Sequence, residues 1–288
     1  MHKDMIINIL QKAKFTKSFI QYIEDHFPRN YQMMDTTPYV KDYLENPLLP
    51  LHAHERMIET IAQLIALQKM YDEKNIPQSH LYNSIYDLSY RIERYFSQHG
   101  IYGLSKRDIR WLTPIFRLEI FDIESLRFQI SHFSYEEIER SGHEYMGVPH
   151  KWKEAIPEGS PIITIHIMKN AKITPEKVTA SFKQAVEFFE QYFPEHHYDL
   201  FVCRTWLLYE PIQELLGENS NITAFAKRFT IIARNNNSKQ ALERIYGTSN
   251  IEDIKKMEKT SSLQKKVYNN LDIVGEAAGI IYKSSIDL

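Results

Sequence analysis

Hydrophobic residues in the first ~110 positions recur every three or four residues, which is typical of amphipathic helices. The pattern predicts helices over Ile6 to Phe27, His54 to Tyr71 and Ser79 to Gln98. Pro28 ends the first of these, and Gly100 follows the third, where a left-handed residue commonly ends a helix. The N-terminal part of the chain is therefore expected to be mostly helical.

The hydrophobic period then changes to two. Ile115 to Phe121 and Ser125 to Phe133 both alternate apolar and polar residues, and only Asp122, Ile123 and Glu124 separate them. This spacing predicts two antiparallel strands joined as a hairpin.

The strongest break in the chain is Pro157 to Pro161, which also contains Gly159 and Ser160. We therefore expect two domains, residues 1–158 and residues 159–288. In the second domain, Thr174, Pro175 and Glu176 supply an N-cap, a first helical proline and an acid in the first turn, so they predict a helix that runs to Phe193. Further strands are expected at Ile162 to Met168, Leu200 to Leu208, Ala226 to Ala233 and Ile280 to Lys283, and further helices at Glu210 to Leu216, Ser238 to Tyr246 and Ser262 to Leu271. The predicted fold class is α+β: a helical N-terminal half with a β-hairpin, followed by a mixed β-sheet with flanking helices.

Composition narrows the function classes. The net charge of −2, from 35 Lys and Arg against 37 Asp and Glu, indicates neither a nucleic-acid partner nor an anionic membrane. Cys203 is the one cysteine, which excludes internal disulfides and fits a cytoplasmic protein. The 9 glycines in 288 residues argue against a Gly-rich phosphate loop, since such loops need several glycines close together.

Familiar catalytic motifs do not occur. The 12 histidines show no zinc-ligand spacing, so no bound metal is expected. There is no G-x-S-x-G element, and Cys203 is read as a small core residue rather than as a nucleophile. The junction from Met168 to Glu176 could bind an anion through the amides of a helix N-terminus or could be simple capping. Two clusters could line a ligand site or could be turns and solvated edges: Arg204, Trp206 and Tyr209, and Ser220 to Phe229 with Asn221 and Arg228 on the way into a strand.

Three blocks resemble a bacterial family in which an N-acyltransferase N-terminal domain precedes a GNAT-like C-terminal domain. The blocks are I-H-I (Ile165 to Ile167) with its helix from Ile173 to Pro194, F-V-C-R-T-W-L-L (Phe201 to Leu208) and S-N-I-x-x-F-x-x-R-F (Ser220 to Phe229). Arg117 to Gln129 agrees more loosely with the N-terminal partner. Most of the chain is covered.

The resemblance implies transfer of an acyl group from acetyl-CoA or a longer acyl-CoA to an amine acceptor that the sequence does not identify. It implies a general base, an acid for the leaving thiolate and a site for pyrophosphate. On this interpretation His166 is the base, and Tyr246 or Tyr209 is the acid. The remaining assignments are as follows: Lys169, Lys172, Ile173, Thr174 and Glu176 bind the cofactor, and Arg204, Trp206, Asn221 and Arg228 line the acceptor cleft.

An alternative stays open. The family's pyrophosphate loop carries glycines, whereas the same position here is Lys169, Asn170, Ala171 and Lys172. The chain could therefore be an inactive protein of the same fold that binds a small metabolite or a protein partner. The oligomeric state is not predicted.

Overall fold

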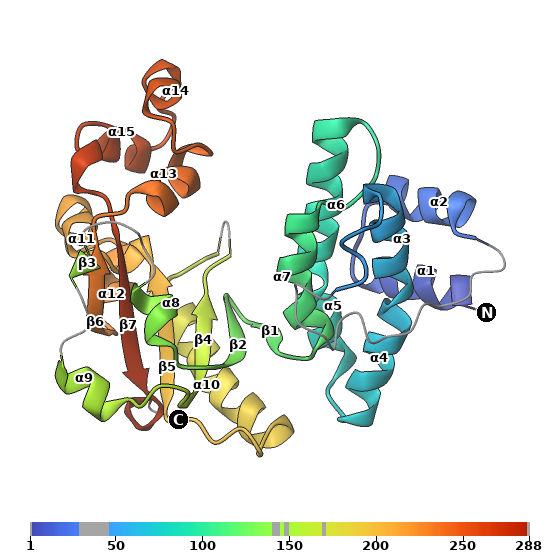
Figure 1. Ribbon diagram of the computed structural model, residues 1–288, viewed down its shortest axis with the longest axis horizontal. Helices are drawn as coiled ribbons and strands as arrows, with labels where there is room; N and C mark the ends of the chain where they lie inside the picture. The colour runs from blue at the N-terminus through green and yellow to red at the C-terminus, as the bar shows by residue number, and fades with distance from the viewer. Residues whose placement is uncertain (1, 29–45, 140–144, 147–149, 169–170, 287–288) are drawn as a thin grey trace. The chain divides into compact units, whose positions relative to one another are not determined.

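The computed structural model describes residues 2–28, 46–139, 145–146, 150–168 and 171–286. The chain forms two compact units, residues Met1–Asp122 and Ile123–Leu288. The first unit is helical, and the second is built on a β-sheet (Figure 1).

The described part of the helical unit contains α1 to α7. Their bounds are α1 His2–Lys12, α2 Lys17–His26, α3 Ala53–Ala62, α4 Leu64–Glu73, α5 Gln78–Ser84, α6 Tyr86–His99 and α7 Lys106–Phe116. The predicted end of α6 is confirmed, because Gly100 follows it with φ of 70° in the left-handed region.

The single helix predicted over Ile6 to Phe27 is wrong, since the segment forms α1 and α2. Lys14 takes a φ of 58°, which interrupts the helix. Thr16 then restarts it as an N-cap, and its hydroxyl accepts a hydrogen bond from the Phe19 amide at 3.3 Å. Hydrophobic periodicity continued across the break because both helices bury their apolar faces.

The strand predicted from Ile115 to Phe121 is also only partly right. Phe116 is the last residue of α7, and strand β1 spans Ile120–Ile123. The stretch fits both periods: Ile109, Leu112 and Phe116 repeat as in a helix and are buried on α7. A capping box at Ser105 and Asp108 starts α7, and this local signal favours the helix.

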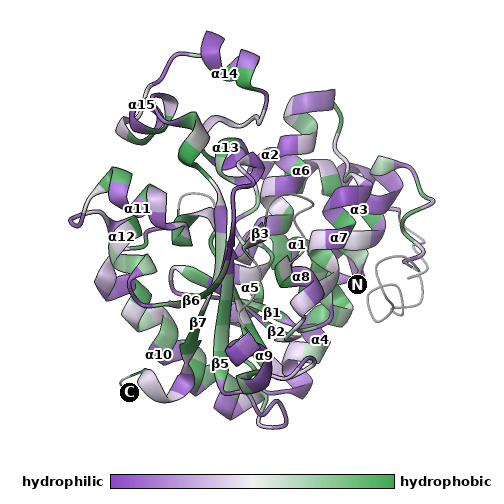
Figure 2. Ribbon diagram, turned by 60° about the vertical axis from the view of Figure 1, so that its left-hand side comes forward, coloured by the Kyte–Doolittle hydropathy of each residue, from purple (hydrophilic) through white to green (hydrophobic). Residues whose placement is uncertain are grey.

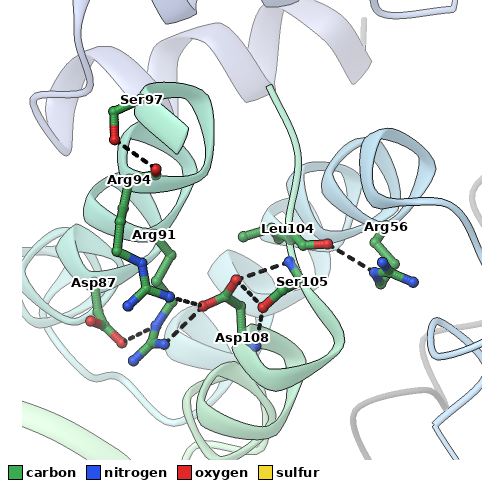
Figure 3. Close-up of polar contacts among 8 residues, drawn as sticks. All are labelled: Arg56, Asp87, Arg91, Arg94, Ser97, Leu104, Ser105 and Asp108. Atoms are coloured by element: carbon green, nitrogen blue, oxygen red, sulfur yellow. Dashed lines mark hydrogen bonds and ion pairs between the residues drawn. The ribbon is translucent and has the colours of Figure 1, made fainter. Parts of the chain in front are cut away.

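Asp108 also joins a charged cluster that ties α6 to the start of α7 (Figure 3). One carboxylate oxygen accepts hydrogen bonds from Arg91 at 3.1 Å and from Arg94 at 3.0 Å, and the other accepts the amide and hydroxyl of Ser105 at 2.9 and 2.6 Å. Arg91 also binds Asp87 at 2.8 Å. Asp108 is 1% exposed, so its charge is balanced almost wholly by these partners.

The second unit holds a seven-stranded sheet whose order is β1-β2-β4-β5-β7-β6-β3. The strands after β1 are β2 Leu126–His132, β3 Tyr145–Met146, β4 Pro161–His166, β5 Leu200–Thr205, β6 Thr230–Asn235 and β7 Glu276–Tyr282. The α-helices are α8 Tyr135–Glu139, α9 His150–Ala155, α10 Pro175–Tyr192, α11 Glu210–Leu216, α12 Asn221–Ala226, α13 Lys239–Tyr246, α14 Ile251–Lys256 and α15 Ser262–Tyr268, and short 3-10 turns lie at Trp206–Leu208, Leu271–Ile273 and Lys283–Ser285. The mixed sheet with flanking helices confirms the predicted fold class.

The two faces of the sheet are covered by different helices. On one face, Phe182 of α10 packs edge-on against Phe128 of β2 and Phe201 of β5, with ring centroids 5.9 and 5.3 Å apart. On the other face, Ile138 of α8 joins a buried cluster with Val202 of β5. Hydrophobic residues accordingly dominate the central strands (Figure 2). Among the described residues, no helix is long and apolar enough to cross a membrane.

The division between the units precedes the position expected from Pro157 to Pro161. Strand β2 pairs antiparallel with β4 from Arg127–His166 to His132–Pro161. Residues 123–158 thus belong to the sheet-bearing unit, and the proline-rich turn is a connection within it. A turn signal marks a change of direction but cannot tell a loop from a domain linker.

We expect Asp108→Ala to lower the free energy of unfolding of the helical unit by about 3–5 kcal/mol, because it leaves the largely buried Arg91 with only part of its counter-charge and removes one half of the capping box of α7. Glu73→Ala, which breaks the exposed Lys69–Glu73 pair, is the control and is expected to cost less than about 0.5 kcal/mol. Urea titration of both variants measures the difference. Equal stabilities would contradict the role given to this cluster.

Candidate active site

The parallel strands β4 and β5 end at the same edge of the sheet. Their pairing runs from Ile163–Phe201 to Ile165–Cys203. His166 follows directly as the last residue of β4, and the chain then leads to the start of α10 at Pro175. Ligands of open α/β sheets bind outside the carboxyl ends of such strands, so this edge is the candidate site.

His166 is held from β2. Its Cα partner across the ladder is Arg127, and its Nε2 lies 2.8 Å from Oε1 of Gln129. A carboxamide oxygen only accepts hydrogen bonds, so this contact favours an N–H at Nε2 of His166.

The surroundings keep the imidazole uncharged. Burial, as the larger cause, and the positive charges of Arg127 and Arg244 together lower the pKa of His166 to about 4. His166 as a whole residue is partly exposed. At neutral pH its ring is therefore neutral.

Next along the edge, Arg204 of β5 forms an ion pair with Glu276 of β7, with Nε and Oε2 3.1 Å apart. Arg204 also donates to the backbone carbonyl of Glu137 on α8. Val202 lies on the face of the sheet that α8 covers, and the period of two places Arg204 on that same face. Glu276 is only 3% exposed, so Arg204 neutralises a buried carboxylate.

The first turn of α10 gathers a second set of polar groups. Thr174 is extended and Pro175 begins the helix, as the sequence predicted. The pKa of Glu176 is lowered, chiefly because its carboxylate accepts its own backbone N–H and also because it accepts the Thr174 hydroxyl. Arg228 donates to the carbonyl of Pro175 at 3.1 Å and to Oγ1 of Thr179 at 2.8 Å.

A family model described as the GNAT-like C-terminal domain matches residues 117–280, which is more than half of the chain. The chain belongs to this family. The match begins directly after α7 ends and covers the sheet described above except for the last two residues of β7. The N-acyltransferase type expected for the N-terminal domain therefore stays a prediction.

Solved structures of acyltransferases share the fold. An acyltransferase in complex with decanoyl-CoA is 19% identical with a TM-score of 0.71, and the match covers 96% of this chain and 87% of that one. The complex with decanoyl-CoA and teicoplanin is 17% identical with a TM-score of 0.71, covering 96% and 86%. A mutant acyltransferase with octanoyl-CoA is 16% identical with the same TM-score, covering 97% and 88%. No curated protein sequence matches the chain.

Within this GNAT-like sheet, the predicted cofactor residues lie on the connection to α10. Thr174 and Glu176 form the helix start, Lys172 is exposed and Ile173 is partly buried. Lys169 lies outside the described residues. The strand predicted from Ala226 to Ala233 is confirmed only from Thr230, where β6 begins: α12 runs to Ala226, and a turn between them carries Arg228. This turn, not a strand, carries Arg228 to the first turn of α10.

The predicted acceptor residues are not all together. Arg204 lies at the strand edge, and Trp206 is buried in the following 3-10 turn, where its amide donates to Oε1 of Gln240 at 2.9 Å. Asn221 is exposed at the first position of α12.

The two candidate acids differ in their surroundings. The Tyr246 hydroxyl donates to the carbonyl of Gln264 at 2.7 Å, and its pKa is raised by burial and by Tyr268. Tyr209 follows the end of β5, is half-buried, and packs closely against Gly275. Only Tyr209 lies near the strand edge in sequence.

Two residues of the site were missed by the sequence reasoning: Gln129 and Glu276. Gln129 stands in the L-R-F-Q stretch, but its role depends on the register of β2 against β4, which periodicity does not give. The last strand was predicted to begin at Ile280, whereas β7 begins at Glu276. A carboxylate in an otherwise apolar run, Glu276 to Ile281, was the available signal.

The described residues form neither an activated thiol nor a metal site. Cys203 is fully buried and burial raises the pKa of its thiol, which supports the core interpretation. Among the described residues, no cluster of three His, Cys, Asp or Glu side chains could hold a metal ion. A surface depression of about 300 Å³ lies at the other end of α10, beside Phe193 and Tyr198, and therefore does not mark the His166 edge.

The lowered pKa of His166 predicts a pH-dependent stability. Between pH 6.5 and about 4 the unfolded state binds the proton and the folded state does not, so stability falls as the pH falls through this window. Because the ring is partly exposed, we expect the wild type to lose on the order of 1–2 kcal/mol more than His166→Gln between pH 7 and pH 4.5. Denaturant unfolding at each pH measures this difference, and parallel curves for the two proteins would contradict a depressed pKa.

Proposed function

We propose that this protein transfers an acyl group from acyl-CoA to a small amine acceptor. One observation carries the proposal: a neutral histidine, His166, stands where the parallel pairing of β4 and β5 ends, directly before the helix start that could bind phosphates. The family and the shared fold of acyltransferases seen with acyl-CoA support it.

The helix start fits the phosphates of a CoA molecule in part. The first amides of an α-helix are free to bind anions, and the 18 residues of α10 give it a substantial dipole. Arg228 and Lys172 would add positive charge to compensate for the missing glycines. The carboxylate of Glu176 already accepts one of these amides, its own, so a phosphate bound to that amide would have to displace it.

The chain's residues then have separate roles. His166 takes the proton of the attacking amine as the new C–N bond forms and the thioester C–S bond breaks. Tyr209 supplies a proton to the leaving thiolate. Arg204 and Trp206 line the acceptor site beside the base, whereas Arg228 binds the phosphates of the cofactor.

A second candidate function is binding without turnover. Glu176 on the helix amides favours it, because an anionic side chain there competes with a phosphate. The two functions differ in one result: the binding protein retains acyl-CoA affinity but releases no CoA thiol with any amine.

The phosphate site is tested by Arg228→Ala. We expect the dissociation constant for octanoyl-CoA, measured by calorimetry, to rise roughly tenfold, because a charge-assisted hydrogen bond is lost. The neighbouring Lys227→Ala is the control, since Lys227 is exposed and pairs with Glu218 at 3.2 Å. Equal effects of the two substitutions would show a general charge effect and contradict a phosphate role for Arg228.

The proton roles are tested with octanoyl-CoA and a panel of primary amines, by following release of the CoA thiol. We expect His166→Ala to lower kcat by about 10²–10⁴-fold while the affinity for octanoyl-CoA stays within about twofold. Tyr209→Phe should lower kcat. Tyr246→Phe should have little effect on kcat, because the Tyr246 hydroxyl already donates a hydrogen bond to the carbonyl of Gln264. Unchanged turnover in His166→Ala would contradict its role as the base.

A further inference from the structure

Helix α13 begins at the sheet edge that holds His166. Strand β5 ends at Thr205, which pairs with Ala277 of β7. Strand β6 ends at Asn235, which pairs with Glu276 of β7. The ends of β5 and β6 therefore share this edge, and the chain passes from β6 into α13 there. Figures 1 and 2 both show α13 beyond this end of the sheet.

One side of α13 faces the neighbouring strands. Oε1 of Gln240 accepts a hydrogen bond at 2.9 Å from the backbone amide of Trp206, which directly follows β5. Arg244 lies about one helical turn after Gln240, so the two side chains share a side of the helix. The positive charge of Arg244 is also among the causes that lower the pKa of His166 at the end of β4. Both relations place Arg244 where an amine would approach the proposed base.

The charge of Arg244 is not balanced within the described part of the chain. Arg244 is exposed and forms neither an ion pair nor a side-chain hydrogen bond with the described residues. Protonation of His166 would bring a second positive charge close to this guanidinium, and like charges repel. A negative charge bound at Arg244 would offset that repulsion while His166 takes the proton of the amine.

The guanidinium of an arginine fits a carboxylate especially well. Its planar fork can donate two parallel N–H groups to the two carboxylate oxygens, and such charge-assisted hydrogen bonds are stronger than neutral ones. Acyl-CoA also carries negative charge, but its phosphates are assigned above to the first turn of α10 beside Arg228. The anion that remains for Arg244 is therefore one carried by the acceptor.

We propose that Arg244 is a specificity-determining residue that binds a carboxylate of the amine acceptor. The acceptor class would then be amino acids and other amines that carry a carboxylate. This inference rests on the proposed function, because it concerns the substrate of the same site.

The experiment compares pairs of primary amines in which a carboxylate is replaced by a neutral carboxamide. The pairs are p-aminomethylbenzoate with p-aminomethylbenzamide, and β-alanine with β-alaninamide. The variants of the full chain are Arg244→Gln, which removes the charge, and Arg244→Lys, which keeps the charge without the planar fork. Lys239→Gln is the matched control, since it removes an exposed cation from another side of the same helix. Because Arg244 is exposed, its variants should fold.

Dissociation constants of the amines are measured by NMR titration. We expect the wild type and Lys239→Gln to bind each carboxylate roughly tenfold more tightly than its carboxamide, as for a charge-assisted contact. In Arg244→Gln the two members of each pair should bind equally, and Arg244→Lys should keep part of the preference. The absence of a preference in the wild type, or a preference that survives in Arg244→Gln, would overturn the proposal.

Kinetics with octanoyl-CoA and the same amines separates this inference from the function on which it rests. Arg244→Gln should raise the KM for the carboxylate amines about tenfold and leave the KM for octanoyl-CoA within about twofold. A raised KM for octanoyl-CoA, with carboxylates and carboxamides affected alike, would show that Arg244 binds a phosphate of the cofactor and would overturn the proposal. Absence of turnover in every protein, with the predicted binding preference present, would reject the acyltransferase and leave Arg244 as a carboxylate-binding residue.

Discussion

Strands β4 and β5 run parallel, whereas β2 with β4, β5 with β7 and β6 with β7 run antiparallel. A parallel pair needs a long crossover, and here α10 provides it across one face of the sheet. The crossover brings the end of β4, the start of α10 and the end of β5 to one edge. For that reason this edge holds His166, Thr174 and Arg204, although Arg204 is distant from the other two in sequence.

Charge at this edge is arranged in two different ways. Arg204 and Glu276 neutralise one another, and the buried carboxylate makes that pair costly to break from either side. At His166, burial and the positive charges of Arg127 and Arg244 lower the pKa, so the ring is neutral at neutral pH. Its Nε2 also lies 2.8 Å from the carboxamide oxygen of Gln129.

Local signals in the sequence were the ones that predicted structure well. Thr174, Pro175 and Glu176 defined the start of α10, and Gly100 the end of α6, because caps depend on adjacent residues. Lys14 was missed because its left-handed backbone is stabilised by context and not by its residue type. His166 was proposed from its place on an inner strand, whereas the contact of Gln129 with it depends on the strand register and the contact of Arg228 with α10 depends on a turn after α12. Such contacts join distant parts of the chain, and composition or periodicity does not encode them.

The most direct measurement is a crystal structure of the protein with a non-hydrolysable thioether analogue of octanoyl-CoA. The pyrophosphate is predicted to lie on the first amides of α10 beside Arg228, with the Glu176 carboxylate displaced. The sulfur is predicted to lie at the ends of β4 and β5, beside the His166 ring. An analogue bound elsewhere, for example in the depression beside Tyr198, or a sulfur remote from His166, would contradict the site described here.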